Sequence, residues 1–361
     1  MQTIINVIVF LLILGSIIII HELGHFLAAK FFGVYCAQFS IGFGPKIFSK
    51  KGKETEYELR ALPFGGFVAM AGEDDQEGNE DMQDVPLERT LKGKKTYQKV
   101  IIFLAGVFMN FVLAIVVLLG VNLTVGELPV NQAQIGEVLE NSVAEKYGLQ
   151  TNDVIQQMYV EETGQTILVT SFEDVRLTQD ALNTKADAIT LDVTYLRNDK
   201  TETVKMKVEY SKEDSLYKLG ITQASRKMNA GEAIQYSFSS FGQMSLAIFD
   251  AVRLLITKFA DTVGQLSGPA GIYQLTAQVT EAGQVAVIFN LLAMLSINIG
   301  IFNLLPIPGL DGCQVLFAIV EKIIGRELPQ KLKLTLQMIG LGLVMLLMVI
   351  VTYQDIMRIF G

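Results

Sequence analysis

Four stretches of the chain are apolar and nearly free of charge. Residues 1–20, 100–126 and 334–354 contain no charged residue, and residues 282–320 contain only Asp311. A helix needs about 20 predominantly apolar residues to cross a membrane. The pattern therefore predicts four membrane-spanning helices, at roughly residues 4–28, 100–122, 284–305 and 334–353.

The loop of residues 31–99 separates the first helical segment, 1–30, from the second, 100–123. Apolar and polar side chains alternate through residues 35–71, around a glycine-containing turn sequence at 51–53. Alternation on both sides of such a turn is typical of a β-hairpin. We therefore expect a hairpin in this loop.

Residues 128–211 have a mixed pattern that predicts a separate α+β domain. Strands are expected at 135–139, 152–155, 190–196 and 202–208, the last two joined by a turn at Asn198-Asp199. A short helix is expected at 142–149, with a glycine at its end. A second is expected at 171–182, with Ser171 as N-cap and Asp174 at the third position.

A long helix is predicted at residues 230–262, where apolar positions recur and the charged residues Asp250, Arg253, Lys258 and Asp261 also occur. These charges favour an amphipathic helix on the membrane surface over a fifth span. The remaining segments are 284–320, which contains the third span and a proline-rich motif, and 334–354, the fourth span.

Composition narrows the possible partners. Half of the residues are hydrophobic and 18% are charged, compared with about 25% charged in soluble domains. The net charge of −8 disfavours a nucleic-acid partner, whereas the apolar stretches imply contact with membrane lipid.

Cys36 and Cys313 lie too far apart in the sequence to suggest a disulfide framework. A cleaved signal peptide is disfavoured, because no basic residue precedes a first apolar run that is also too long.

Basic residues near the ends of the predicted spans indicate how the chain is oriented in the membrane. Five of them lie at 89–99, before the second span, and the next is Lys146. Further basic residues precede the fourth span. Because Lys and Arg are enriched in cytoplasmic loops, we expect residues 30–99 and 306–333 to be cytoplasmic. Both termini and residues 123–283 should then lie on the side of the membrane that faces away from the cytoplasm.

Both histidines of the chain lie in one pentapeptide, His21-Glu22-Leu23-Gly24-His25, at the end of the first apolar stretch. On a helix, HExxH places two imidazoles on one face, where they bind zinc beside a glutamate that acts as general base. Ionisable groups in a membrane helix are costly and mark functional sites by default. We expect His21 and His25 to bind Zn²⁺ and Glu22 to take a proton from the water that the zinc activates.

A catalytic zinc has three protein ligands and keeps one position for water. The chain has no third histidine, so the third ligand must be Asp, Glu or Cys. Asp311 is the strongest candidate, because it is the only charge in its apolar stretch and follows two helix-breaking prolines. Spans 1 and 3 are also expected to run in the same direction, which brings His21 and Asp311 to a similar depth. Cys313 is the alternative, although a buried cysteine is usually a small hydrophobe.

HELGH in the first helix, together with NLLPIPGLDG at 303–312, resembles the bacterial site-2 proteases, the intramembrane zinc metalloproteases of peptidase family M50. Ala105-Gly106, Asn110-Phe111 and 267–269 match as well. The resemblance implies that His21, His25 and Asp311 are the zinc ligands and that Glu22 is the catalytic base. It also implies that Asn303 helps to hold the substrate or the transition state. The alternative for Asn303 is a cap on the broken helix.

The resemblance also gives the two extramembrane segments a role. The hairpin is similar to a membrane-associated, re-entrant β-loop that binds an unwound substrate by strand addition, where Gly65 and Gly66 let the backbone approach the substrate. A plain cytoplasmic hairpin is the alternative. Residues 128–211 resemble a PDZ domain, with Asn152-Asp153 in place of the usual Gly-Asp. Such a domain would either exclude untrimmed substrates or capture substrates.

These observations predict a polytopic α-helical protein of the bacterial cell membrane, with a β-hairpin loop and an extracytoplasmic α+β domain. The resemblance implies a zinc metalloendopeptidase whose partners are single-pass membrane proteins already cut outside, such as anti-sigma factors or signal-peptide remnants. Two other functions compete with this one. A membrane scaffold that keeps the metal for structure would not need Glu22, and a metal transporter would need polar groups along the whole span.

Overall fold

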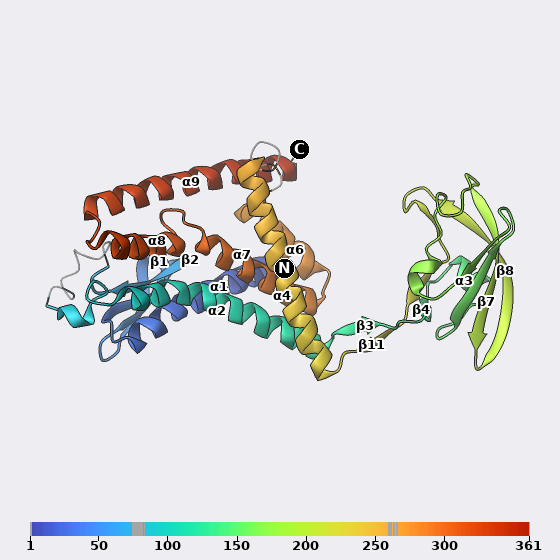
Figure 1. Ribbon diagram of the computed structural model, residues 1–361, viewed down its shortest axis with the longest axis horizontal. Coiled ribbons are helices and arrows are strands. Elements are labelled where there is room, and N and C mark those ends of the chain that lie inside the picture. The colour runs from blue at the N-terminus through green and yellow to red at the C-terminus, as the bar shows by residue number, and fades with distance from the viewer. Residues whose placement is uncertain are drawn as a thin grey trace. The chain divides into compact units, whose positions relative to one another are not determined.

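The computed structural model describes residues 2–73, 82, 84–258, 262, 264 and 266–360, and the chain forms two compact units (Figure 1). Unit 1 combines Met1–Thr124 with Glu232–Gly361, and unit 2 is Val125–Gly231. Unit 1 is mainly helical and includes the hairpin, whereas unit 2 consists mainly of β-strands. The HELGH motif and Asp311 both belong to unit 1.

Among the described residues, four helices are long and apolar enough to cross a membrane, all of them in unit 1. They are α1 (Gln2–Phe31), α2 (Thr96–Thr124), α7 (Val285–Leu304) and α9 (Gln330–Phe360). The four helices predicted from the apolar stretches are thus confirmed. Three of them extend past the predicted limits, because polar residues at their ends continue the helix.

Helix α2 packs against both α1 and α7. One cluster of buried side chains joins α1 to α7, namely Ile13, Ile17, Leu291, Leu292 and Leu295. A second joins α2 to α7, namely Ala114, Leu118, Ala293, Ile297 and Ile301. Lipid tails are as apolar as these side chains, so close packing holds such helices together. A Cβ atom at Gly300 would lie 2.6 Å from the Phe111 ring, which shows how close this packing is.

The third apolar segment is broken where its two prolines predict a break. Helix α7 ends at Leu304, and α8 (Asp311–Ile324) begins at Asp311, after Pro306 and Pro308. A Cβ atom at Gly312 would lie 2.3 Å from the Leu304 carbonyl oxygen. Only glycine therefore lets the first turn of α8 pack against the end of α7.

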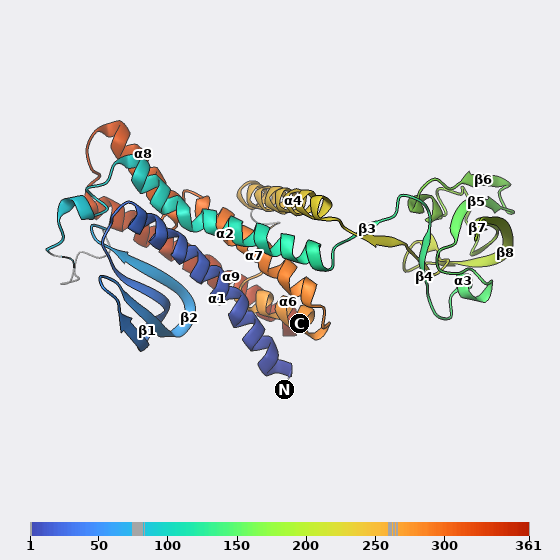
Figure 2. The same ribbon diagram turned by 90° about the horizontal axis from the view of Figure 1, so that it is seen from below.

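Strands β1 (Cys36–Lys51) and β2 (Glu56–Met70) confirm the predicted hairpin. The strands bend, so that residues 38–41 of β1 pair with two stretches of β2, 56–59 and 66–69. The hairpin packs against α1 (Figure 2). The end of β2 at 66–69 is a sheet edge, since no third strand in the described part of the chain pairs with this hairpin.

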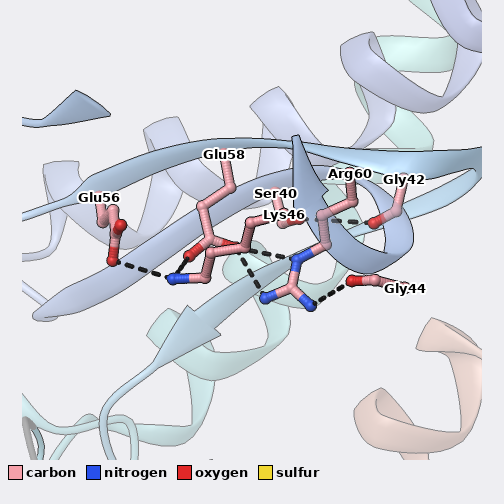
Figure 3. A network of polar contacts seen from close by, with 7 residues as sticks. All are labelled: Ser40, Gly42, Gly44, Lys46, Glu56, Glu58 and Arg60. Atoms are coloured by element: carbon pink, nitrogen blue, oxygen red, sulfur yellow. Dashed lines mark hydrogen bonds and ion pairs between the residues drawn. The ribbon is translucent and has the colours of Figure 1, made fainter. Parts of the chain in front are cut away.

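The bent hairpin encloses the carboxylate of Glu58, whose side chain is fully buried. Figure 3 shows the Lys46 ammonium and the Arg60 guanidinium at this carboxylate, with Arg60 Nη2 2.7 Å from Glu58 Oε2. Arg60 also donates to the Gly44 carbonyl oxygen at 3.1 Å, and Lys46 Nζ lies 3.3 Å from a Glu56 carboxylate oxygen. A buried charge is tolerated only with such partners, so these contacts hold the bent strands in register.

The short 3-10 helix η3 (Leu87–Arg89), between the hairpin and α2, is held by Glu54 in the hairpin turn. Glu54 accepts hydrogen bonds from Lys30 Nζ at 2.9 Å and from Arg89 at 2.8 Å. These two bonds, with that from Lys30 the stronger cause, hold the pKa of the Glu54 carboxyl below its usual value. The end of α1, the hairpin turn and η3 are thereby joined.

Helices α4 (Ala230–Thr257) and α6 (Pro269–Glu281) complete unit 1. Helix α4 confirms the predicted long helix as far as residue 257, and residues 259–261 lie outside the described residues. It is not one of the helices apolar enough to cross a membrane. Asn122 of α2 donates to the Ser237 hydroxyl of α4 at 2.9 Å, and both side chains are buried. Helix α6 was not predicted.

Unit 2 contains a five-stranded antiparallel sheet in the order β6-β5-β7-β8-β9. Its strands are β5 (Val154–Val160), β6 (Gln165–Leu168), β7 (Ala188–Arg197), β8 (Lys200–Ser211) and β9 (Leu216–Tyr217). Two further pairs are β4 (Ile135–Val138) with β10 (Ile221–Gln223), and β3 (Glu127–Pro129) with β11 (Ser225–Lys227). The strands predicted in this region correspond to β4, β5, β7 and β8.

The turn predicted at Asn198-Asp199 is confirmed by the backbone. Asn198 and Asp199, between β7 and β8, have φ angles of 49° and 60°, and Asn152 has a φ of 73°. Asparagine and aspartate are the non-glycine residues that tolerate this region best. The short helix α3 (Val143–Lys146) confirms the helix predicted at 142–149, although it is shorter, and Ser142 is its N-cap.

The helix predicted at 171–182 is wrong. Ser171 and Asp174 form the predicted capping box, but only the 3-10 helix η4 (Phe172–Val175) follows it. The buried Leu177 instead forms a β-bridge, and its carbonyl oxygen accepts from the Tyr217 N–H at 2.8 Å. Tertiary pairing at this position overrides the local helical preference.

Candidate active site

A pocket of about 430 Å³ in unit 1 is lined by both sequence motifs. Helix α1 contributes His21, Glu22 and His25, and the start of α8 with its preceding loop contributes residues 309–311. The edge of β2 contributes 66–68 and 70, and α9 contributes residues between 334 and 341. Segments almost 300 residues apart in the sequence thus meet at one pocket.

Three side chains that can bind a metal converge in this pocket. His21 Nε2 and His25 Nε2 lie 3.2 Å apart. Asp311 Oδ2 lies 3.1 Å from His21 Nε2 and 3.4 Å from His25 Nε2. In a tetrahedral zinc site with bonds of about 2.0–2.1 Å, two ligand atoms are about 3.3 Å apart. The triangle formed by these three atoms therefore has the spacing of three ligand atoms in a tetrahedral zinc site. The fourth ligand position remains for another group.

The protonation of His25 is set by the backbone of α2. Its Nδ1 lies 2.8 Å from the Ile102 carbonyl oxygen. A carbonyl oxygen can only accept, so Nδ1 carries the proton and Nε2 keeps a free lone pair. Metal-binding histidines typically donate their second N–H to such a partner.

The buried side chain of Asn110 in α2 sets the environment of His21. Its amide nitrogen lies 3.2 Å from His21 Nδ1. Asn110 Oδ1 is buried and has no hydrogen-bond partner among the described residues. A half turn of the amide exchanges its two ends, and places Oδ1 where it accepts from a protonated Nδ1. His21 Nε2 is then free for a metal, as in His25.

Asp311 Oδ2 is likewise buried without a hydrogen-bond partner in the described part of the chain. Three acceptor atoms with free lone pairs, within 3.4 Å of one another, repel each other unless a cation lies among them. Two imidazoles and one carboxylate are a usual ligand set of a hydrolytic zinc site. The residues present therefore fit Zn²⁺.

Two glycines bring α1 and α2 together at the site. A Cβ atom at Gly24 would lie 2.3 Å from the Ala105 carbonyl oxygen, and one at Gly106 would lie 2.3 Å from His25 Nε2. Both distances are impossible for a real side chain. The two helices therefore approach closely enough for the histidines to reach Ile102 and Asn110 only because both positions are glycine.

The two glycines predicted to position the substrate differ in their surroundings. Gly66 lines the pocket, and a Cβ atom there would lie 3.0 Å from Glu22 Cγ. Gly65 has a φ of 88° and packs on Phe43, whose ring would lie 2.1 Å from an added Cβ. Close packing within the hairpin therefore accounts for Gly65, and only Gly66 reaches the pocket.

Asn303 and Cys313 lie outside the cluster of ligand atoms. Asn303 is half-buried in the last turn of α7 and is not among the residues that line the pocket. Cys313 is buried in α8 and is not among the grouped metal-binding side chains of the described residues. Neither side chain completes the triangle of His21, His25 and Asp311.

The sequence pattern missed the supporting residues of α2. Ala105-Gly106 and Asn110 stand out in the sequence only through the family resemblance, and Ile102 does not stand out at all. Asn110 follows Gly106 by four residues, so both lie on one helix face. A polar side chain on the small-residue face of an uncharged apolar helix was the available signal. The Ile102 contact involves a backbone atom, which leaves no trace in the sequence.

The sequence matches the model of peptidase family M50 over residues 9–347, nearly the whole chain. The chain belongs to peptidase family M50. The regulator of sigma-W protease RasP of Bacillus subtilis is 32% identical over an alignment of 432 positions. The alignment covers 98% of this chain and 99% of that protein. The zinc metalloprotease RasP of Bacillus licheniformis is 30% identical, with the same coverage. This M50 member is therefore a zinc metalloprotease, and its four apolar helices make it a membrane protein.

Proposed function

We propose that this M50 protease cleaves peptide bonds within membrane-spanning segments, with His21, His25 and Asp311 as zinc ligands. The observation that carries the proposal is the triangle of ligand atoms, 3.1–3.4 Å apart, between an apolar helix and the start of α8. When bound, zinc lowers the pKa of a water molecule and polarises the substrate carbonyl. The Ile102 carbonyl oxygen beside His25 and the Asn110 side chain beside His21 support the tautomers that this requires.

Glu22 is the general base in this proposal. It lines the pocket between the two histidines of the motif. Its carboxylate takes a proton from the water that attacks the substrate carbonyl carbon. When the C–N bond breaks, Glu22 gives this proton to the leaving amine nitrogen. The base is thus restored in one turnover.

The edge of β2 is the proposed substrate-binding strand. A peptide bond within a helix is shielded, so the substrate must be unwound before it can be cut. Residues 66–68 and 70 line the pocket, and their outer edge pairs with no strand in the described part of the chain. An extended segment added to this edge would run past Glu22, with Gly66 allowing close approach.

Asn303 and Gly65 have weaker support as substrate-positioning residues. Asn303 heads the motif that ends at Asp311, but its side chain lies in the last turn of α7, outside the pocket lining. Gly65 acts by permitting the packing of Phe43 in the hairpin. Both would position the substrate indirectly, Asn303 from the end of α7 and Gly65 through the shape of the β2 edge.

The orientation in the membrane follows from the basic residues. With residues 30–99 and 306–333 in the cytoplasm of a bacterial cell, unit 2 and both termini lie outside. The active site then lies in the membrane, toward its cytoplasmic side. The exposed apolar side chains of the hairpin, among them Phe43, Ile47, Phe48, Leu59 and Leu62, support its contact with lipid.

Unit 2 is proposed to be a PDZ domain that excludes untrimmed substrates. The support is its compact sheet, the buried Asp153 after Asn152, and the short helix α3. Substrates would be single-pass proteins already cut outside, such as anti-sigma factors or signal-peptide remnants. The name of the Bacillus subtilis relative, a regulator of a sigma-factor system, favours the first of these.

The test is to locate the cleaved bond. A single-pass substrate lacking its external domain is incubated with purified protein in detergent, and the products are identified by mass spectrometry. The proposal predicts a cut inside the apolar segment, absent with Glu22→Gln. Cuts only outside that segment would reject intramembrane cleavage. A scaffold would produce no cut, and a transporter would show zinc flux that depends on the motif.

A further inference from the structure

Helix α9 contributes one face to the active-site pocket. Its lining residues are Leu334, Gln337, Met338 and Leu341, at positions i, i+3, i+4 and i+7 of a helix. Three of them are apolar, and Gln337 is the polar member. This face and the edge of β2 line the same pocket as the metal-binding cluster.

The amide oxygen of Gln337 is buried and has no hydrogen-bond partner among the described residues. Buried polar atoms in folded proteins nearly always have a partner. Gln337 lines the active-site pocket, so a rotation of its amide would bring this oxygen within reach of a molecule bound there. A glutamine side chain both donates and accepts, which matches the C=O and N–H of a peptide backbone.

The structure fixes the position of this face. A Cβ atom at Gly340 would lie 2.0 Å from the Pro308 carbonyl oxygen, so α9 packs directly on the loop before Asp311. At the far end of α9, the buried Asp355 carboxylate accepts from the N–H groups of Gly268 and Gly271 at 2.9 and 2.8 Å. Gln337 lies one turn before Gly340 and is therefore held at the pocket.

We propose that Gln337 binds the backbone of the unwound substrate segment next to the cleaved bond. The segment then lies between the β2 edge and α9, with its apolar side chains against Leu334, Met338 and Leu341. This inference rests on the proposed intramembrane cleavage. It adds a substrate contact on α9, which neither motif contains.

Proximity tests the contact without relying on activity. In full-length protein with Glu22→Gln, Cys36→Ala and Cys313→Ala, Gln337→Cys is combined with single cysteines along the apolar segment of a trimmed substrate. Oxidation should give a disulfide with substrate positions next to the cleaved bond. Gln354→Cys is the matched control, because Gln354 also has a buried, unpartnered amide oxygen in α9 but does not line the pocket. No crosslink from 337, or equal crosslinking from 354, would overturn the proposal.

Kinetics give the second readout. Gln337→Leu should lower kcat/KM by about tenfold, because the substrate backbone loses its partner, while the zinc content stays unchanged. Gln354→Leu should leave kcat/KM unchanged. If the wild type cleaves a membrane-spanning segment and Gln337→Leu does so equally well, this inference fails and the proposed function stands. If the wild type cleaves no such segment, the proposed function itself fails.

Discussion

Gly106 lies so close to His25 that a Cβ atom at position 106 would be 2.3 Å from His25 Nε2, the atom that faces Asp311. Gly106→Ala must therefore displace the His25 ring or separate α1 from α2. We expect zinc affinity and activity to fall by about 10- to 100-fold, as for other changes that disturb the support of a metal ligand. Zinc affinity is measured by competition with a chelator.

Gly120→Ala is the matched control, since Gly120 lies in the same helix and a Cβ atom there would meet nothing within 4 Å. It should bind zinc and cleave substrate like the wild type. Equal zinc affinity in the two variants would show that the close approach at Gly106 does not support the site.

Asn110 is expected to act through His21, whose Nδ1 lies 3.2 Å from its amide. Removing the amide in Asn110→Ala leaves the His21 ring without its partner, so zinc should bind about 10- to 100-fold more weakly. Asn122→Ala removes another buried asparagine of α2, one that bonds Ser237 instead. It should bind zinc normally, and a similar loss in both variants would indicate general destabilisation of α2.

The buried Glu58 carboxylate should be essential for the shape of the hairpin. In Glu58→Gln, Lys46 and Arg60 lose the charge that they share. Breaking a buried ion pair by removing one partner typically costs about 3–5 kcal/mol. Hydrogen exchange at the amides of β1 and β2 should accelerate strongly. Glu56→Gln, which changes a more exposed partner of Lys46, should have little effect, and unchanged exchange in Glu58→Gln would contradict this account.

Most of unit 2 can be removed between two positions that the structure defines. The Val130 N–H donates to the Ala224 carbonyl oxygen at 2.9 Å, just beyond the β3–β11 pair. Replacing residues 131–223 by Asn-Gly should therefore close a hairpin with a two-residue turn. If unit 2 is a filter, the shortened protein should cleave untrimmed substrates that the wild type leaves intact.

A trimmed substrate is the control for that experiment. The shortened protein should cleave it at the wild-type rate. Loss of this cleavage, with zinc content retained, would mean that unit 2 recruits substrates and would reject the filter.

The candidate metal-binding cluster was predictable because its residue types are rare in apolar segments. Two histidines and Asp311 stand out against uncharged surroundings, and the prolines before Asp311 show where the chain turns. The hairpin was predictable because alternation of apolar and polar residues on both sides of a glycine-containing turn is typical of a β-hairpin. Both signals are local in the sequence.

The parts that were not predictable depend on contacts between distant segments. The helix expected at 171–182 gives way to the bridge between Leu177 and Tyr217, which no local preference reveals. The Ile102 carbonyl oxygen fixes the tautomer of His25 with a backbone atom. The sequence does not distinguish Gln337 from other polar residues of an apolar helix, and its place in the pocket lining becomes visible only in the structure.

The most direct test of the central claim is the zinc content of purified protein, measured together with cleavage of a trimmed single-pass substrate. The wild type and Glu22→Gln should each hold about one zinc ion per chain, and only the wild type should cleave. Asp311→Asn should lose zinc and activity together. Cleavage by Glu22→Gln at the wild-type rate, or a full zinc content in Asp311→Asn, would contradict the assignment of the site.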